Sequence, residues 1–373
     1  MHRLLVRLGI AGDERQRVVL RAVVIAVITW VPLLILSLID RQAYGRQTAV
    51  PFLRDYAVNV RLLLAVPILI LAESGVDKRW RILVLQFLRS GLVTEQDLPA
   101  FEAIIQKTVD MRDRILPEIL MFVAAYLPLL ITRTEFLMSD VSTWHNTSPG
   151  EISMAGWWFN LICTPFVRFL FFRWIWRMIV WTLLLWRITR LNLYLVPTHT
   201  DLAAGLGFLS EGQKAFSPIV FAGGAIIASQ VLNAIAYQGE TLSSMKFPMI
   251  GYGVLAILFL IAPLLVVTPL LIRTKRKALR EYGALVTQHD QEFDRKWIRQ
   301  DKAPEEMLLG NPDASSLADL GASFTVVREM GVVPIDKPTL ITLAIAAALP
   351  MLPVIFIATP TNELIRIVIK MLG

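Results

Sequence analysis

The sequence has little of what catalytic, redox and metal sites are built from. Its 373 residues include one cysteine, Cys163, and four widely separated histidines. A single cysteine excludes an intrachain disulfide and a cysteine-based metal cage. The sequence also lacks a P-loop, an HExxH motif, a GxSxG elbow and a Rossmann fingerprint. We therefore predict no catalytic residue, no metal and no cofactor, and the sequence argues against ATP-driven transport by this chain alone.

Charged residues are also scarce, at 18% of the chain, while 55% of the residues are hydrophobic and the mean hydropathy is +0.58. A soluble protein carries about 25% charged residues. Several apolar runs approach the ~20 residues that an α-helix needs to cross a bilayer. We predict an all-α protein: a polytopic transmembrane helical bundle in the lipid bilayer, with helical cytoplasmic extensions.

Seven segments are candidates for crossing the bilayer: 18–39, 60–75, 117–132, 157–186, 216–237, 249–272 and 338–358. The second and third are short, which fits a re-entrant segment or one held inside a bundle. We assign residues 1–272 to a transmembrane region with the first six spans and 273–337 to a cytoplasmic helical segment. Residues 338–373 form the last span and an interfacial C-terminal helix. The helix after the sixth span is expected to continue that span as one long helix.

Loop charges predict the orientation of these spans. Lysine and arginine gather in the N-terminal segment, in the loop between the second and third spans, and directly after the sixth. The loops 133–155 and 238–248 hold one basic residue each, Arg133 and Lys246. The positive-inside rule then places the N-terminus in the cytoplasm and the C-terminus outside. This topology and anionic lipid account for the net charge of +7 without nucleic acid, and we expect no signal peptide.

The fourth predicted span carries Arg168, Arg173 and Arg177. An arginine at the centre of a membrane helix costs about 2.5–3.5 kcal/mol on insertion scales, so it faces protein, water or a functional path. On a helical projection Arg173 and Arg177 lie about 40° apart, and Arg168 lies about 140° from Arg173. The pattern predicts a basic path or a binding site for anions. Alternatively, Arg168 and Arg173 pair with buried acids such as Glu73 or Glu118 for structure alone.

The fifth predicted span has one polar face. Its members are Ser229, Gln230, Asn233 and Tyr237, while Gly223 and Gly224 permit close approach of a neighbouring helix. A polar stripe on a membrane helix is typical either of a seam with interhelical hydrogen bonds or of a pore lining. Both interpretations remain open at this point.

The loop after the fourth span contains Thr198, His199, Asp201, Gly205 and Gly207. His199 and Asp201 are two residues apart and can share a metal or a proton. Thr198 and the two glycines can offer backbone N–H groups to a phosphate or carboxylate. The alternative is a capped helix start with glycines for tight packing. We treat these residues as a gating or motif loop.

At this loop the sequence resembles a known family. The segments PTHTDLAAGLGFL (197–209) and SSLADLGASFTVVREM (315–330), together with the upstream RWIWRMIVWTLLLWRITRLNL, are similar to those of bacterial multi-spanning inner-membrane proteins of no established activity. The resemblance covers roughly residues 157–355 and departs from the family pattern at Thr200 and Ala204. It implies a multi-pass protein of the bacterial inner membrane.

The functional hypothesis is a channel or passive transporter for a small anion or polar solute, built as a homo-oligomer. The arginines attract the anion, the polar face of the fifth span replaces part of its hydration shell, and the motif loop gates the cytoplasmic mouth. One alternative is a membrane enzyme acting on a lipid or phosphate-bearing substrate, with His199 and Asp201 as acid and base. Another is a sensor or scaffold whose cytoplasmic helices bind a partner.

Overall fold

The computed structural model describes residues 14–45, 48–131, 142–148, 151–299 and 312–358. Six helical segments in these ranges are long and apolar enough to cross a membrane: Val18–Ile39, Tyr56–Arg89, Met154–Ile188, Phe208–Tyr237, Leu242–Leu265 and Lys337–Ile357. The strands described are β1 (Asn146–Ser148) and β2 (Glu151–Ile152), which form one short antiparallel hairpin. The prediction of an all-α helical membrane bundle is therefore confirmed.

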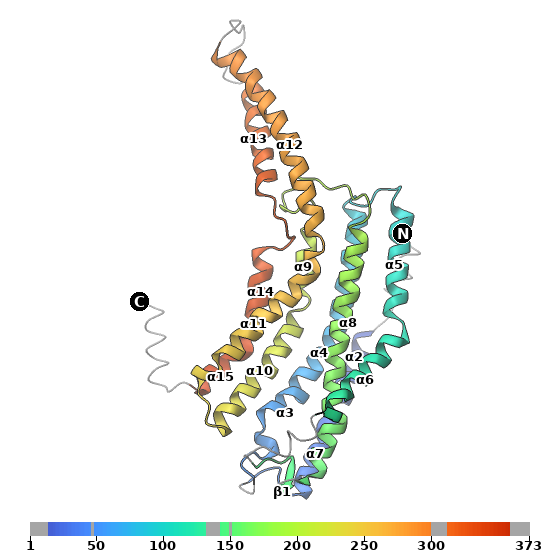
Figure 1. The fold of residues 1–373 in the computed structure, drawn as a ribbon, viewed down its shortest axis with the longest axis vertical. Coiled ribbons are helices and arrows are strands. Elements are labelled where there is room, and N and C mark those ends of the chain that lie inside the picture. The colour runs from blue at the N-terminus through green and yellow to red at the C-terminus, as the bar shows by residue number, and fades with distance from the viewer. Residues whose placement is uncertain (1–13, 46–47, 132–141, 149–150, 300–311, 359–373) are drawn as a thin grey trace.

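The helices follow one another along the chain with few long connections (Figure 1). In the first half they are α2 (Glu14–Ile39), α3 (Tyr56–Val60), the π-helical turn η2 (Arg61–Ala65), α4 (Val66–Arg89), α5 (Leu98–Arg112) and α6 (Ile115–Ile131). After the hairpin come α7 (Met154–Trp158), the π-helical turn η4 (Phe159–Cys163), α8 (Thr164–Ile188), α9 (Phe208–Lys214) and α10 (Ser217–Tyr237). The last group is α11 (Leu242–Leu265), α12 (Thr268–Phe293), α13 (Pro312–Glu329), α14 (Lys337–Ala348) and α15 (Leu352–Ala358).

The segment predicted as a third span, 117–132, is helix α6, which has 17 described residues and is not one of the six. The chain nevertheless runs the length of the bundle here. After α4, the Leu92 carbonyl accepts a hydrogen bond from the Tyr194 amide at the end that carries α12 and α13. Before α7, the Trp144 amide donates to the Val50 carbonyl at the opposite end (Figure 1). Helices α5 and α6 together connect these two ends.

The expected single long helix after residue 249 is wrong, because the structure has two helices there. Helix α11 ends at Leu265 and α12 begins at Thr268, with Pro269 in its first turn. Proline lacks the N–H that would continue the helix, and its ring clashes with the preceding turn, so it starts a new helix instead. The crossing helix Leu242–Leu265 thus begins and ends earlier than the predicted span 249–272.

Helices α12 and α13 form an antiparallel hairpin that projects beyond the bundle, here called the arm (Figure 1). Near its tip, the Asp313 carboxylate accepts hydrogen bonds from Lys296 (2.7 Å) and from the Trp297 indole (3.1 Å). Near its base, the Lys275 ammonium donates to the Met330 carbonyl at 2.6 Å, and the Gly331 amide donates to the Leu202 carbonyl at 2.7 Å. The arm is therefore fixed to the loop that follows α8.

The link from the arm into α14 is also fixed. The Asp336 carboxylate caps α14 by accepting from the Thr339 amide, and the Ser210 hydroxyl of α9 donates to the same carboxylate. The interfacial helix expected after residue 358 lies outside the described residues.

Two glycines of α10 allow the close packing that its sequence predicted. A Cβ on Gly223 would lie 2.4 Å from the Tyr252 hydroxyl of α11, and one on Gly224 would lie 2.9 Å from the Ala347 carbonyl of α14. These three helices therefore approach one another at a distance that only glycine permits.

Candidate functional site

Four charged side chains meet between α4 and α8. Glu73 and Asp77 are four residues apart on α4, and Arg173 and Arg177 are four apart on α8, so each pair shares one helix face. Arg177 Nη1 lies 2.6 Å from Asp77 Oδ1, Arg177 Nη2 lies 3.6 Å from Glu73 Oε2, and Arg173 Nη2 lies 3.3 Å from Glu73 Oε1. The four side chains, called the quartet below, have no net charge when all are ionised.

The quartet matches the structural interpretation, in which the arginines pair with buried acids, only in part. Arg173 pairs with Glu73, as the structural alternative expected, while Glu118 lies exposed on α6. Asp77 lies beyond the predicted span 60–75 and was not considered as a partner. In the structure α4 continues past it to Arg89. Arg168 pairs with neither acid, and among the described residues it forms no ion pair at all.

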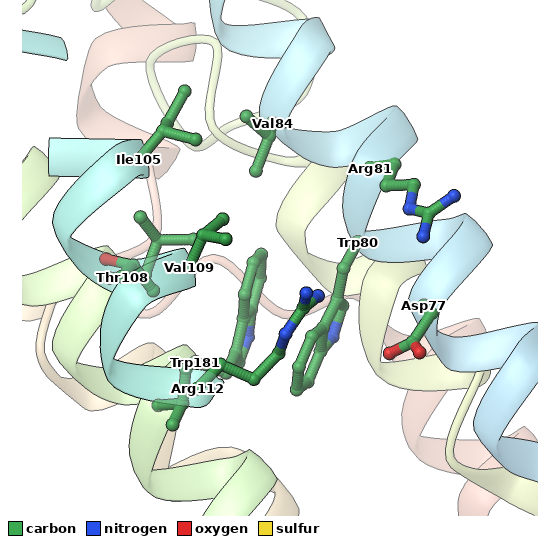
Figure 2. Close-up of a pocket in the computed structure, with 11 residues that line it drawn as sticks. Asp77, Trp80, Arg81, Val84, Ile105, Thr108, Val109, Arg112 and Trp181 are labelled. Atoms are coloured by element: carbon green, nitrogen blue, oxygen red, sulfur yellow. The ribbon is translucent and has the colours of Figure 1, made fainter. Parts of the chain in front are cut away.

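A cavity of about 250 Å³ lies beside the quartet, between α4, α5 and α8 (Figure 2). Its polar lining consists of Asp77, Arg81, Thr108 and Arg112, and its apolar lining of Trp80, Val84, Ile105, Val109, Val180, Trp181 and Leu184. The rings of Trp80 and Trp181 are stacked with their centroids 5.0 Å apart and form one wall. The lining thus holds two arginines and one aspartate; Asp77 pairs with Arg177 of α8, and Arg112 pairs with the neighbouring Asp113 at 2.7 Å.

Helix α5 brings a further arginine contact to this cavity. Arg112 lies in its last turn and points toward α4 (Figure 2). A hydrogen bond to Asp113 raises the pKa of the Arg112 guanidinium, against the opposing effect of burial, so this group stays charged. On the same helix, Thr108 accepts a hydrogen bond from Arg187 of α8 at 3.3 Å. Arginines of all three helices thus line the cavity or contact its lining.

Sequence reasoning missed this cavity because it assigned Asp77, Arg81 and Arg112 to a loop. The missed signal is the helical spacing of Trp80, Val84 and Phe87, which continues the apolar face of α4 past the predicted end of the span.

The polar face of α10 does not meet the arginines of α8. At the end of the bundle away from the arm, the Asn233 amide donates to Asp55 Oδ1 at 2.8 Å, and its oxygen accepts from the Tyr56 amide at 3.0 Å. The Tyr237 hydroxyl donates to the Arg54 carbonyl at 3.0 Å. These contacts form a seam between α10 and the start of the second crossing segment.

The two other members of this face are not part of that seam. The Ser229 hydroxyl is buried and donates to the Ile226 carbonyl of its own helix at 2.8 Å. Gln230 lies exposed.

His145 lies in the same region, beside Asp55. Its Nε2 is 3.9 Å from Asp55 Oδ2, and its ring stacks on Trp144 with a centroid separation of 3.8 Å. Burial lowers the pKa of His145 to about 4; the negative charge of Asp55 opposes this shift, and the positive charge of Arg61 adds to it. His145 is therefore neutral at pH 7.

The motif loop is organised around Asp201. Its carboxylate accepts hydrogen bonds from the amides of Ala203 (2.8 Å), Gly205 (3.1 Å) and Gly207 (2.8 Å). A Cβ on Gly207 would lie 2.8 Å from the Asp201 side chain, and the φ of Gly205 is +93°. The two glycine amides thus donate to Asp201, which favours a structural role for the loop over a phosphate site, although α9 itself begins at Phe208 without a side-chain cap.

His199 is the most accessible member of this loop. Its Nδ1 lies 2.9 Å from Asp201 Oδ1, its side chain is 50% exposed, and Thr198 beside it is half-buried. In the described ranges no three His, Cys, Asp or Glu side chains are grouped so that they can hold a metal ion. The loop therefore offers one histidine–carboxylate pair to solvent.

No protein-family model, curated protein or solved structure matches this chain. The family resemblance of segments 197–209 and 315–330 therefore stays a prediction, and the quartet and its cavity carry the functional argument.

Proposed function

We propose that this protein is a channel or passive transporter for a small anion, and that the cavity between α4, α5 and α8 is a binding site on the anion's path. The observation that carries the proposal is that two arginines, Arg81 and Arg112, and one carboxylate, Asp77, line the cavity, and that the acid paired with Arg112, Asp113, is not part of the lining. Its volume is about eight times the ~30 Å³ that a water molecule occupies in the liquid, enough for an inorganic anion with part of its hydration shell.

The chemistry of the lining suits an anion that must bind and leave again. Guanidinium groups are weakly hydrated and present several N–H donors, so they replace water around an anion at little desolvation cost. The stacked rings of Trp80 and Trp181 add no competing acceptor for these donors. Conduction needs binding that is favourable enough for entry and weak enough for exit, and a half-open arginine site meets both conditions.

The quartet sits where an anion leaves the cavity for the rest of the bundle. Arg177 contacts both Asp77 at 2.6 Å and Glu73 at 3.6 Å. An anion that displaces Asp77 from Arg177 therefore leaves that arginine with Glu73 as a counter-charge. In this proposal the quartet is the barrier of the path, and the exchange of partners at Arg177 is the step that crosses it.

Charge distribution supports a cytoplasmic position for the arm and the cavity. The end of the bundle that carries the arm is rich in basic residues, among them Arg89, Arg190, Arg273, Lys275 and Arg276. The described parts of the opposite end contain few. By the positive-inside rule the arm lies in the cytoplasm, the N-terminus lies on the same side, and a bacterial inner membrane is the location we propose.

Flux into proteoliposomes of the purified protein tests the proposal, with chloride, phosphate and potassium compared. Arg112→Gln removes a charge that lines the cavity, and Arg114→Gln removes a charge two residues away that does not line it. We expect anion-selective flux that Arg112→Gln lowers by about tenfold, because cavity charge concentrates anions locally, and that Arg114→Gln leaves unchanged. Equal flux in both variants, or potassium passing as fast as chloride, would contradict the proposal.

A further inference from the structure

The cavity between α4, α5 and α8 has a charged end and an apolar end. Asp77 of α4 and Arg112 of α5 lie at the end away from the arm, while Val84 of α4 and Ile105 of α5 lie at the end nearer the arm (Figure 2). The third helix, α8, adds only apolar side chains to the lining, which are Val180, Trp181 and Leu184. A ligand that matches both ends therefore carries its charge on one side and an apolar group on the other.

The charged end keeps a hydrogen-bond donor for such a ligand. Arg112 Nε and Nη2 donate to the two carboxylate oxygens of Asp113, at 2.7 Å and 3.3 Å. Its Nη1 has no acceptor among the described residues, and the guanidinium group extends from α5 toward α4 across the cavity (Figure 2). Guanidinium groups bind carboxylate oxygens through short, charge-assisted hydrogen bonds. Asp77 at the same end repels a second negative charge, which favours a ligand with one.

The apolar part of the lining is more than an inorganic ion needs. The whole cavity measures about 250 Å³, whereas an apolar protein cavity of about 150 Å³ holds a benzene molecule. Trp181 is almost fully buried, and its ring stacks on that of Trp80 with the two planes 8° apart. A hydrated inorganic anion leaves this aromatic wall in contact with water. An apolar group in the same place removes the wall and itself from water, which is favourable.

We propose that the cavity binds a small organic monocarboxylate. Its carboxylate accepts from Arg112 at the charged end, and its aromatic or branched aliphatic body fills the end lined by Val84, Ile105 and Leu184. This inference rests on the proposed function, in which the cavity lies on the path of an anion, and it names the class of anion. Inorganic ions use the charged end alone and bind more weakly.

Equilibrium dialysis of the purified full chain in neutral detergent measures this binding without flux, with protein-free micelles as the blank. The labelled probes are benzoate and 3-methylbutanoate. Acetate and chloride compete as anions without an apolar body, and benzyl alcohol competes as a ring without charge. Arg112→Gln changes the charged end, and Ile105→Phe fills the apolar end. The matched controls are Arg114→Gln and Ile119→Phe, at positions that do not line the cavity.

We expect at least one labelled carboxylate to bind tenfold or more tightly than acetate and chloride, because burial of its body adds to the charge contact. Benzyl alcohol should compete at least tenfold more weakly than the acid. Arg112→Gln should lower the affinity about tenfold, since it removes a charge-assisted hydrogen bond, and Ile105→Phe should abolish binding. Both controls should bind as the wild type does.

A second variant at the apolar end, Ile105→Ala, keeps the test decisive if Ile105→Phe does not fold. It widens that end and should raise the affinity for 2-naphthoate relative to benzoate at least threefold. Neither carboxylate binding more tightly than acetate, benzyl alcohol competing as well as the acid, or equal effects of Ile105→Phe and Ile119→Phe would overturn the inference. Carboxylate binding without any flux keeps the site and contradicts the transporter. Chloride flux without carboxylate binding keeps the transporter and overturns this ligand class.

Discussion

The quartet and the cavity beside it use arginines in different ways. Arg173 and Arg177 of α8 each have a carboxylate of α4 within ion-pair distance, whereas the cavity is lined by two arginines, Arg81 and Arg112, and one carboxylate. On α8 the pairing follows from helix geometry, because Glu73 and Asp77 match the spacing of Arg173 and Arg177, while Arg168 points about 140° away from Arg173 and about 180° away from Arg177. What an arginine inside a membrane helix binds therefore depends on what the facing helix offers.

Arg177→Ala should produce the largest effect of the changes considered, because it leaves Asp77 without a partner and weakens the charge balance at Glu73. Breaking a buried ion pair costs about 3–5 kcal/mol, and we expect about 3 kcal/mol here because the two side chains are 14% and 29% exposed. Chemical unfolding in detergent measures this loss. The exchanged double variant Asp77→Arg/Arg177→Asp should recover part of the stability. If the double variant is as unstable as the single one, the pair is not what holds α4 to α8.

Acid should weaken the region around His145 and Asp55. His145 has a folded-state pKa of about 4, below its value of 6.5 in the unfolded chain. The unfolded state therefore binds more protons between pH 6.5 and pH 4, and stability falls as the pH is lowered through this window. Since one pKa unit corresponds to about 1.4 kcal/mol, the total is on the order of 3 kcal/mol.

Unfolding midpoints of the wild type and of His145→Gln between pH 7 and pH 4 measure this dependence. The variant should lose most of the pH dependence, since it has no proton to bind. An unchanged pH profile in the variant would assign the acid sensitivity to another group.

The motif loop should behave as structure and not as part of the anion path. Gly207→Ala places a Cβ 2.8 Å from the Asp201 side chain, which then has to move away from the amides it caps. We expect a loss of about 1–3 kcal/mol and faster hydrogen exchange at Ala203 and Gly205. Gly251→Ala, with open space around the added Cβ, is the control and should show neither effect. A large loss of anion flux in Gly207→Ala at unchanged stability would return this loop to a gating role.

The smallest effect is expected in the arm. Gly283 of α12 lies beside Phe324 of α13, and an added Cβ would meet that ring at 3.7 Å, an ordinary contact distance. Gly283→Ala should therefore stabilise α12 by about 0.5–1 kcal/mol through helix propensity alone. Circular dichroism on heating checks the gain, and flux should stay at the wild-type value. A clear change in flux would show that the arm controls the bundle.

The sequence predicts the crossing helices well and the charge network only in part. The length of the apolar runs identified the regions of all six crossing segments. Each helix needs about 20 apolar residues to cross the lipid, whatever the other helices contain. The sequence also offered Glu73 as a partner for Arg173, since few acids lie inside the spans. It missed Asp77, because the apolar run ends before the helix does.

Other features depend on contacts that no local pattern contains. The hydrogen bonds from the loop amides to Asp201 were not predicted, and the sequence left a ligand site and a helix cap open, because backbone amides can bind a side chain or a ligand equally well. The seam through Asn233 and Asp55 joins residues 178 positions apart. Their pairing follows from the packing of α10 on α3, which single-sequence periodicity cannot specify.

Anomalous diffraction from crystals of the full chain grown in sodium bromide tests the central comparison most directly. We predict one bromide peak in the cavity lined by Arg81 and Arg112. No peak should lie between Arg173 and Arg177, because Glu73 and Asp77 already pair with those guanidinium groups. Bromide bound within the quartet, or no bromide in the cavity, would contradict the account.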